Sequence, residues 1–100
     1  MPTFVFTYRT TRPASGDAGP TPEALEAWRS WFAGIGDHVA EMGKPVFEST
    51  SVGATDSSST SLGGYSVISA DDLEAAVTLA KGCPVLGYGG GVEIGQLGDM

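Results

Sequence analysis

The sequence predicts an α+β fold in which two helices cover one face of a four-stranded antiparallel sheet. Short segments with alternating apolar residues indicate strands, and two longer segments carry apolar residues at helical spacing. These segments follow one another in the order βαββαβ. Right-handed crossovers then place both helices on one face of the sheet, which is the ferredoxin-like arrangement.

The first strand is expected from Thr3 to Arg9, because Phe4, Phe6 and Tyr8 alternate with threonine and valine. The segment TTRPASGDAGP that follows is rich in proline, glycine and small polar residues, which favour turns. We therefore expect a loop between the first strand and the first helix.

The first helix is expected from Thr21 to Met42. Thr21 can accept a hydrogen bond from a free backbone amide, and Pro22 suits the first helical position. Apolar residues then recur at spacings of three and four, at Leu25, Trp28, Phe32, Ile35, Val39 and Met42. Gly34 and Gly36 weaken the middle by about 1 kcal/mol each relative to alanine, which indicates a kink or a close contact there.

Three further strands are expected, at Val46–Val52, Tyr65–Ile68 and Gly91–Leu97. The polar tract GATDSSSTS indicates an exposed hairpin connection before the third strand. Gly63 and Gly64 lead into that strand and indicate either a bulge or a close backbone approach. The glycines of GYGGG before the last strand lack the spacing and the lysine of a phosphate-binding loop, so we interpret them as a turn.

The second helix lies between the third and fourth strands. Either Ser69 with Asp72 or Asp71 with Glu74 supplies its capping pair, and the sequence leaves both alternatives open. Gly82 and Pro84 end the helix. Its buried stripe is expected to contain Leu73, Ala76, Val77 and Ala80.

Size and charge limit the function classes. One hundred residues are expected to form a single domain, residues 1–100. The formal net charge of −7 disfavours nucleic acid and anionic membranes as partners. The chain has one cysteine, no signal-peptide pattern and no apolar run of membrane-spanning length, so we expect a cytoplasmic protein without an internal disulfide.

Both faces of the expected sheet carry apolar side chains, for example Phe4 and Phe6 on one face and Val5 on the other. Two helices can cover only one of these faces. We therefore expect a homodimer in which the second face packs against the same face of another copy.

The chain resembles the YCII-related family, in the branch of DGPF-domain proteins. The likeness rests on Leu62-Gly63-Gly64-Tyr65, on the helix start Asp71 to Ala76, on Gly82-Cys83-Pro84 and on Gly91-Val92-Glu93-Ile94. Thr21-Pro22-Glu23 and the tryptophans Trp28 and Trp31 also fit the family. The resemblance implies a ferredoxin-like protomer that dimerises through its sheets into a dimeric α/β barrel.

Two features depart from that family. Residues 56–61 read DSSSTS where the Asp-Gly-Pro-Phe segment belongs, and Ala24 and Cys83 stand where the enzymatic members carry histidine and aspartate. The family's acid/base pair is therefore absent. We expect a small dimeric protein that binds a small organic ligand or a partner; the alternative is a lyase- or isomerase-type enzyme that acts on small compounds, including aromatic ones.

His38 is the candidate catalytic residue for that alternative. In the expected helix it lies beside Trp31 and Met42, where it either acts as a general base or simply borders the packed face. Cys83 is expected at a helix C-terminus, which disfavours a thiolate, so we interpret it as a small buried residue.

Arg9, Trp31 and Tyr65 are the candidate ligand-binding residues. Together with His38 they are expected to line a pocket between the sheet and the first helix for a small anionic or aromatic molecule; otherwise Arg9 pairs with a surface carboxylate. The sequence contains no cluster with metal-ligand spacing and no cofactor motif, so we expect neither a metal nor a cofactor.

Overall fold

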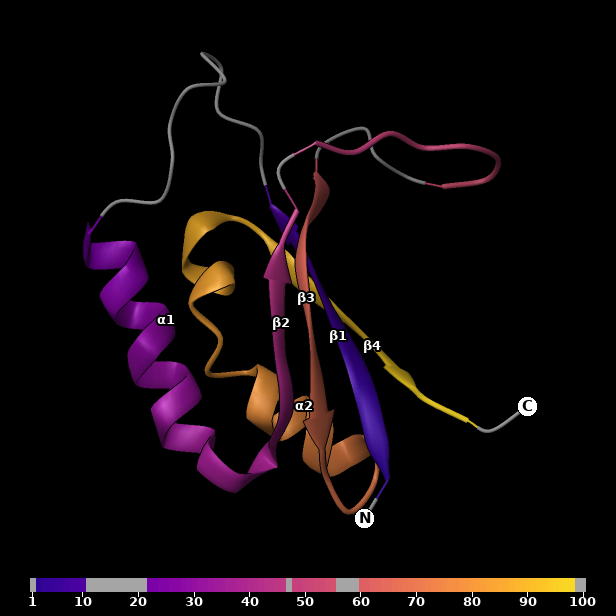
Figure 1. Cartoon of the computed structure of the whole chain (residues 1–100). Helices are drawn as coiled ribbons and strands as arrows, with labels where there is room; N and C mark the ends of the chain where they lie inside the picture. Colours follow the sequence, from indigo (N-terminus) through magenta and orange to yellow (C-terminus); the bar gives the residue numbers. More distant parts are fainter. Residues whose placement is uncertain (1, 11–21, 47, 56–59, 99–100) are drawn as a thin grey trace.

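The computed structural model describes residues 2–10, 22–46, 48–55 and 60–98. Four antiparallel strands form one sheet in the order β2-β3-β1-β4, and both helices lie on the same side of it (Figure 1). This is the predicted ferredoxin-like α+β arrangement. The elements are β1 (Thr3–Thr10), α1 (Pro22–Ile35), η1 (Gly36–His38), β2 (Val39–Pro45), β3 (Ser61–Ser69), α2 (Leu73–Ala80), η2 (Pro84–Tyr88) and β4 (Gly91–Gln96).

The core lies between the sheet and the helices. β1 supplies Phe4, Phe6 and Tyr8 to it, as the alternating pattern predicted, and each is at least 95% buried. The other elements contribute Trp31, Ile35, Ile68, Ala76, Ala80 and Val85. No helix in the described part of the chain combines the length and the apolar character needed to cross a membrane.

The prediction of one helix from Thr21 to Met42 is wrong at its C-terminal end. α1 ends at Ile35, and Gly36 adopts a left-handed conformation with φ of +49°, which a helix cannot continue through. The chain then reverses through η1. Thr21 itself lies outside the described residues.

The second strand is therefore earlier than predicted: β2 spans Val39–Pro45 instead of Val46–Val52. Val39 pairs with Ile68 of β3, and Lys44 pairs with Tyr65. Val39 fits both a helical stripe and a pleated strand, so the spacing of apolar residues did not distinguish them. The pairing with β3, which is distant in the sequence, decides for the strand.

The second helix is capped by one of the four residues in the two expected capping pairs. Asp72 is the N-cap, and its carboxylate accepts a hydrogen bond of 2.8 Å from the amide of Ala75. Ala76 and Ala80 are buried as expected, whereas Leu73 is 51% exposed and Val77 37% exposed. The two alanines therefore form the buried face of α2, and Leu73 and Val77 lie at its more exposed side.

Gly63 and Gly64 lie inside β3, which begins at Ser61 instead of the predicted Tyr65, and they fulfil both of the alternative roles. The register passes from Tyr8 opposite Gly64 to Arg9 opposite Leu62, so Gly63 is the extra residue of a bulge. A Cβ atom on Gly64 would lie 3.1 Å from the carbonyl oxygen of Lys44, which shows a close backbone approach. The segment between η2 and β4 is a turn, closed by a hydrogen bond from the Gly90 amide to Val85.

A chain of hydrogen bonds ties three strands together on the helix side of the sheet. The Tyr8 hydroxyl of β1 donates to Ser66 Oγ of β3 at 2.8 Å. Ser66 Oγ in turn donates to the carbonyl oxygen of Met42 in β2 at 2.6 Å. Ser66 has no exposed surface, so this hydroxyl satisfies both neighbours away from water.

We expect Ser66→Ala to lower the free energy of unfolding by about 2 kcal/mol, because it leaves the buried Tyr8 hydroxyl without its acceptor and the Met42 carbonyl without its donor. Tyr8→Phe should cost only about 1 kcal/mol, since Ser66 keeps its bond to Met42. Urea denaturation of both variants measures the difference. Equal losses in the two variants would show that the hydrogen bond from Ser66 to the Met42 carbonyl adds little to the free energy of unfolding.

Candidate functional site

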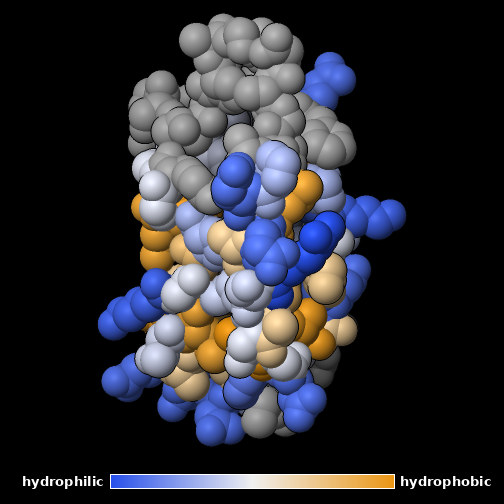
Figure 2. Space-filling model, turned by 90° about the vertical axis from the view of Figure 1, so that its left-hand side faces the viewer, coloured by the Kyte–Doolittle hydropathy of each residue, from blue (hydrophilic) through white to orange (hydrophobic). Residues whose placement is uncertain are grey.

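An apolar groove lies between α1 and the edge strand β2. It has a volume of about 480 Å³, and its lining residues are Leu25, Trp28, Arg29, Phe32, Ala33, Gly36, Val39 and Met42. Met42 is 60% exposed and Leu25 42% exposed, although both were expected in the buried stripe of one helix. Viewed from the α1 side, hydrophobic surface shows between hydrophilic side chains (Figure 2).

The groove exists because the apolar stripe of α1 is wider than the contact between α1 and the sheet. Trp31 and Ile35 point into the core and are each 8% exposed. Trp28 and Phe32 lie only partly buried beside them. The outer part of the stripe therefore faces β2 across the groove instead of packing in the core.

Aromatic contacts make the α1 wall of the groove stiff. The ring of Trp28 meets Tyr8 edge to face at a centroid distance of 4.8 Å, and Phe32 lies 4.9 Å from Trp31. Trp31 is fixed in turn by a hydrogen bond of 3.1 Å from its Nε1 to the carbonyl oxygen of Leu79. The aromatic part of this wall is thus held in place before a ligand binds, whereas the groove residues Leu25, Arg29 and Met42 are exposed.

Arg29 contributes a cation to the groove. Its guanidinium lies 3.9 Å from the Glu26 carboxylate, and both side chains are more than 70% exposed. A pair this exposed contributes little stability. Arg29 therefore remains available to contact a polar substituent of a bound molecule.

His38 is the last residue of the short 3-10 helix η1, just before the groove residue Val39, and not on the long α-helix that was predicted. Its Nδ1 is 2.8 Å from the carbonyl oxygen of Ser69, and Ser69 Oγ donates back to the His38 carbonyl at 3.2 Å. A carbonyl oxygen only accepts, so Nδ1 carries the hydrogen. In the neutral ring Nε2 then holds the lone pair that a general base requires.

The structure does not bring the four predicted site residues together. Arg9 and Tyr65 share the face of the sheet that is opposite to the helices, where Tyr65 pairs with Thr7. Trp31 lies on the helix side, in the core. His38 contacts Ser69, and Ser69 pairs with Thr3 at the start of β1. Arg9 lies six residues further along β1, so His38 and Arg9 are roughly 20 Å apart at 3.3 Å per residue.

The remaining candidates behave as buried structural groups. Cys83 is 3% exposed, and burial raises the pKa of its thiol to about 11, which disfavours the nucleophilic thiolate. The described residues contain no group of three or more histidine, cysteine, aspartate or glutamate side chains that could hold a metal ion.

We expect the protein to lose stability in alkaline solution. Burial raises the pKa of Cys83 from 9.0 to about 11 and that of Tyr8 above its usual range, so both groups stabilise the fold in their neutral forms. This contribution is complete below pH 9 and is lost as the pH rises toward the folded-state pKa. Cys83 alone accounts for about 2 to 3 kcal/mol at pH 11.

Urea denaturation between pH 8 and pH 11 measures this loss. In Cys83→Ala only the loss of stability that comes from Tyr8 remains. The free energy of unfolding of this variant should therefore fall less steeply with rising pH than that of the wild type. An identical decline in the variant would contradict the assignment to Cys83.

Sequence reasoning did not identify the groove. Leu25 and Met42 were assigned to one buried stripe, and the groove depends on their being on different elements. The signal was the breadth of the apolar face: Trp31 lies three residues after Trp28 and four before Ile35, so it forms a second row beside Leu25 and Phe32 and widens the face beyond what one sheet contact covers.

Comparisons with known proteins agree with the fold. No family model and no curated protein sequence matches the chain. Among solved structures, 5-chloro-2-hydroxyhydroquinone dehydrochlorinase (TftG) from Burkholderia phenoliruptrix AC1100, in complex with 2,5-dihydroxybenzoquinone, superposes with a TM-score of 0.62. The match covers 98% of this chain and 95% of the dehydrochlorinase at 15% sequence identity. The two chains share one fold.

Proposed function

We propose that this protein binds a small aromatic molecule in the groove between α1 and β2. The observation that carries the proposal is the groove itself, which has a volume typical of small-molecule sites and is lined by Leu25, Phe32 and Met42 with Trp28 beside them. A flat ring that enters the groove would bury its faces against aromatic and aliphatic side chains. The dihydroxybenzoquinone in the TftG complex is likewise a small molecule with a flat six-membered ring, which supports the choice of ligand class.

We extend the proposal to the organisation of the protein. The resemblance to YCII-related proteins and the shared fold with TftG support a single YCII-related domain over residues 1–100. Val5, Tyr65 and Val67 lie on the face of the sheet that the helices leave uncovered. A second copy packed on this face would bury them, so we propose a cytoplasmic homodimer formed through the sheets.

A second candidate function is catalysis on the bound ring compound, with His38 as general base. The hydrogen bond between Nδ1 and Ser69 favours this candidate, because it leaves the lone pair on Nε2. The flanking residues Gly36 and Val39 both line the groove. His38→Gln should abolish turnover of such a compound and leave its binding intact if His38 is the base.

The binding proposal is tested with Met42→Glu, which puts a carboxylate on an exposed wall of the groove. Hydroquinone and dihydroxybenzoquinone should raise the Tm of the wild-type protein, because a ligand that binds the folded state stabilises it. Quenching of the tryptophan fluorescence, to which the groove residue Trp28 contributes, should give the affinity. In Met42→Glu the affinity should fall roughly tenfold or more, since the ring would desolvate the new charge.

Leu86→Glu is the matched control, because Leu86 is an apolar residue with 46% exposure that does not line the groove. This variant should bind as the wild type does. Equal affinity in Met42→Glu, or no Tm shift with either compound, would overturn the proposal.

A further inference from the structure

A second cleft lies where β1 ends and β3 begins, away from the groove. It has a volume of about 610 Å³, and Arg9 forms part of its wall. Serine and threonine side chains make up most of the remaining lining, at Ser49, Thr50, Ser51, Thr55 and Ser61. Its chemistry is therefore opposite to that of the groove: one cation among hydroxyl groups.

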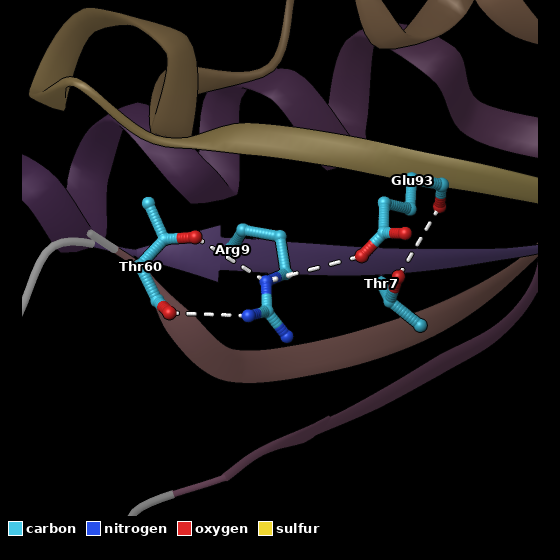
Figure 3. A network of polar contacts seen from close by, with 4 residues as sticks. All are labelled: Thr7, Arg9, Thr60 and Glu93. Carbon is cyan, nitrogen blue, oxygen red and sulfur yellow. Dashed lines mark hydrogen bonds and ion pairs between the residues drawn. The ribbon is translucent and has the colours of Figure 1, made fainter. Parts of the chain in front are cut away.

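The guanidinium of Arg9 is held in place at this wall (Figure 3). Its Nη2 donates to the carbonyl oxygen of Thr60 at 3.1 Å, and its Nε donates to Thr60 Oγ1 at 3.4 Å. Glu93 of β4 lies 3.8 Å from Nε, with the carboxylate 72% exposed. The Arg9 side chain is only 21% exposed, so a ligand would meet a cation that is already oriented.

We propose that this cleft binds a small organic acid that carries one carboxylate and at least one hydroxyl group. The planar guanidinium matches the geometry of a carboxylate, and serine and threonine hydroxyls both donate and accept hydrogen bonds to ligand hydroxyls. Val52 and Leu62 also line the cleft and offer contact to a short carbon chain.

The charge of the protein selects a monoanion over a dianion such as phosphate. The chain has a net charge of −7, and Glu93 lies beside the cation that would bind the ligand. Repulsion from these charges grows with the charge of the ligand, whereas a single carboxylate is enough to pair with Arg9.

The inference stands apart from the aromatic ligand proposed above. Arg9 and Leu62 line the cleft, whereas the groove lies between α1 and β2 and shares no lining residue with it. Met42→Glu, which should weaken binding in the groove, should leave binding in the cleft unchanged.

The test uses lactate as the probe and lactamide, its neutral analogue, as the control ligand, in NMR titrations of the full chain. Lactate should shift the amide signals of Arg9, Ser61 and Leu62 in a saturable manner, and lactamide should not. At pH 8, where inorganic phosphate is mostly the dianion, it should bind more weakly than lactate at the same ionic strength. Binding of lactamide equal to that of lactate, or tighter binding of phosphate, would overturn the proposal.

Arg9→Gln should reduce the lactate affinity at least tenfold, while Arg29→Gln, which removes an arginine from the groove, should not change it. Arg9→Lys keeps the charge but loses the planar fork, and it should fall between the wild type and Arg9→Gln. Because Lys preserves the ion pair with Glu93, this variant keeps the test valid if Arg9→Gln fails to fold. Unchanged affinity in every folded Arg9 variant would refute the site.

Discussion

Replacing Gly43 by alanine should lower the free energy of unfolding by about 3 kcal/mol or more. Gly43 has a φ of +78°, which costs a residue with a side chain about 1 to 2 kcal/mol. The new Cβ would also overlap the carbonyl oxygen of Tyr65 in the neighbouring strand. The clash is between backbone-attached atoms of two paired strands, and neither strand can move without breaking that pairing. We therefore expect β2 to separate locally from β3.

Gly53→Ala is the matched control for this prediction. Gly53 has the same φ of +78°, but nothing lies within 4 Å of the position that its Cβ would take. The free energy of unfolding of this variant should fall only by the cost of placing a residue with a side chain at positive φ, about 1 to 2 kcal/mol. Urea denaturation gives both values, and equal losses would show that the contact with Tyr65 relaxes without cost.

Loss of β2 pairing should also affect the groove. Val39 and Met42 form its β2 wall, so Gly43→Ala should weaken aromatic ligands even at temperatures where the core stays folded. The fluorescence titration proposed for Met42→Glu measures this effect. Undiminished affinity would mean that α1 alone forms the binding surface.

Phe6→Ala should have the other large effect, a loss of about 3 to 5 kcal/mol. Phe6 is completely buried at the centre of β1, and its ring stacks near Trp31 with a centroid distance of 6.4 Å. Removing the ring leaves a cavity between the sheet and both helices that the surrounding backbone cannot fill. A small domain is stable by only about 5 to 15 kcal/mol, so the Tm should fall sharply.

Val5→Ala provides the comparison on the same strand. Val5 points to the face that the helices leave uncovered, and its side chain is only partly buried in the single chain. We expect a loss of about 1 kcal/mol in dilute protein. A loss that grows with protein concentration would identify the sheet face as a dimer interface, because dimer stability depends on concentration.

Local patterns were sufficient for most of the fold. The alternation of Phe4, Phe6 and Tyr8 placed β1 and its buried face. Gly63 and Gly64 indicated either a bulge or a close backbone approach, and the structure has both. The position of α2 was predicted because residues that cap or break helices lie close to both ends of its apolar segment. Each of these features is set by residues that are neighbours in the sequence or by one periodicity.

The candidate site was beyond the reach of such patterns. Sequence reasoning grouped His38, Arg9 and Trp31 around one pocket, whereas the structure places them at separate ends and faces of the sheet. The error follows from the second strand, because extending the helix to Met42 carried His38 onto a helical face. The sequence determined the order of elements and the buried face of β1, since these depend on short-range periodicity. The pairing of Val39 with Ile68 was decided only by the tertiary structure, because a stripe of Val39 and Met42 satisfies helical spacing equally well until β3 offers its backbone hydrogen bonds.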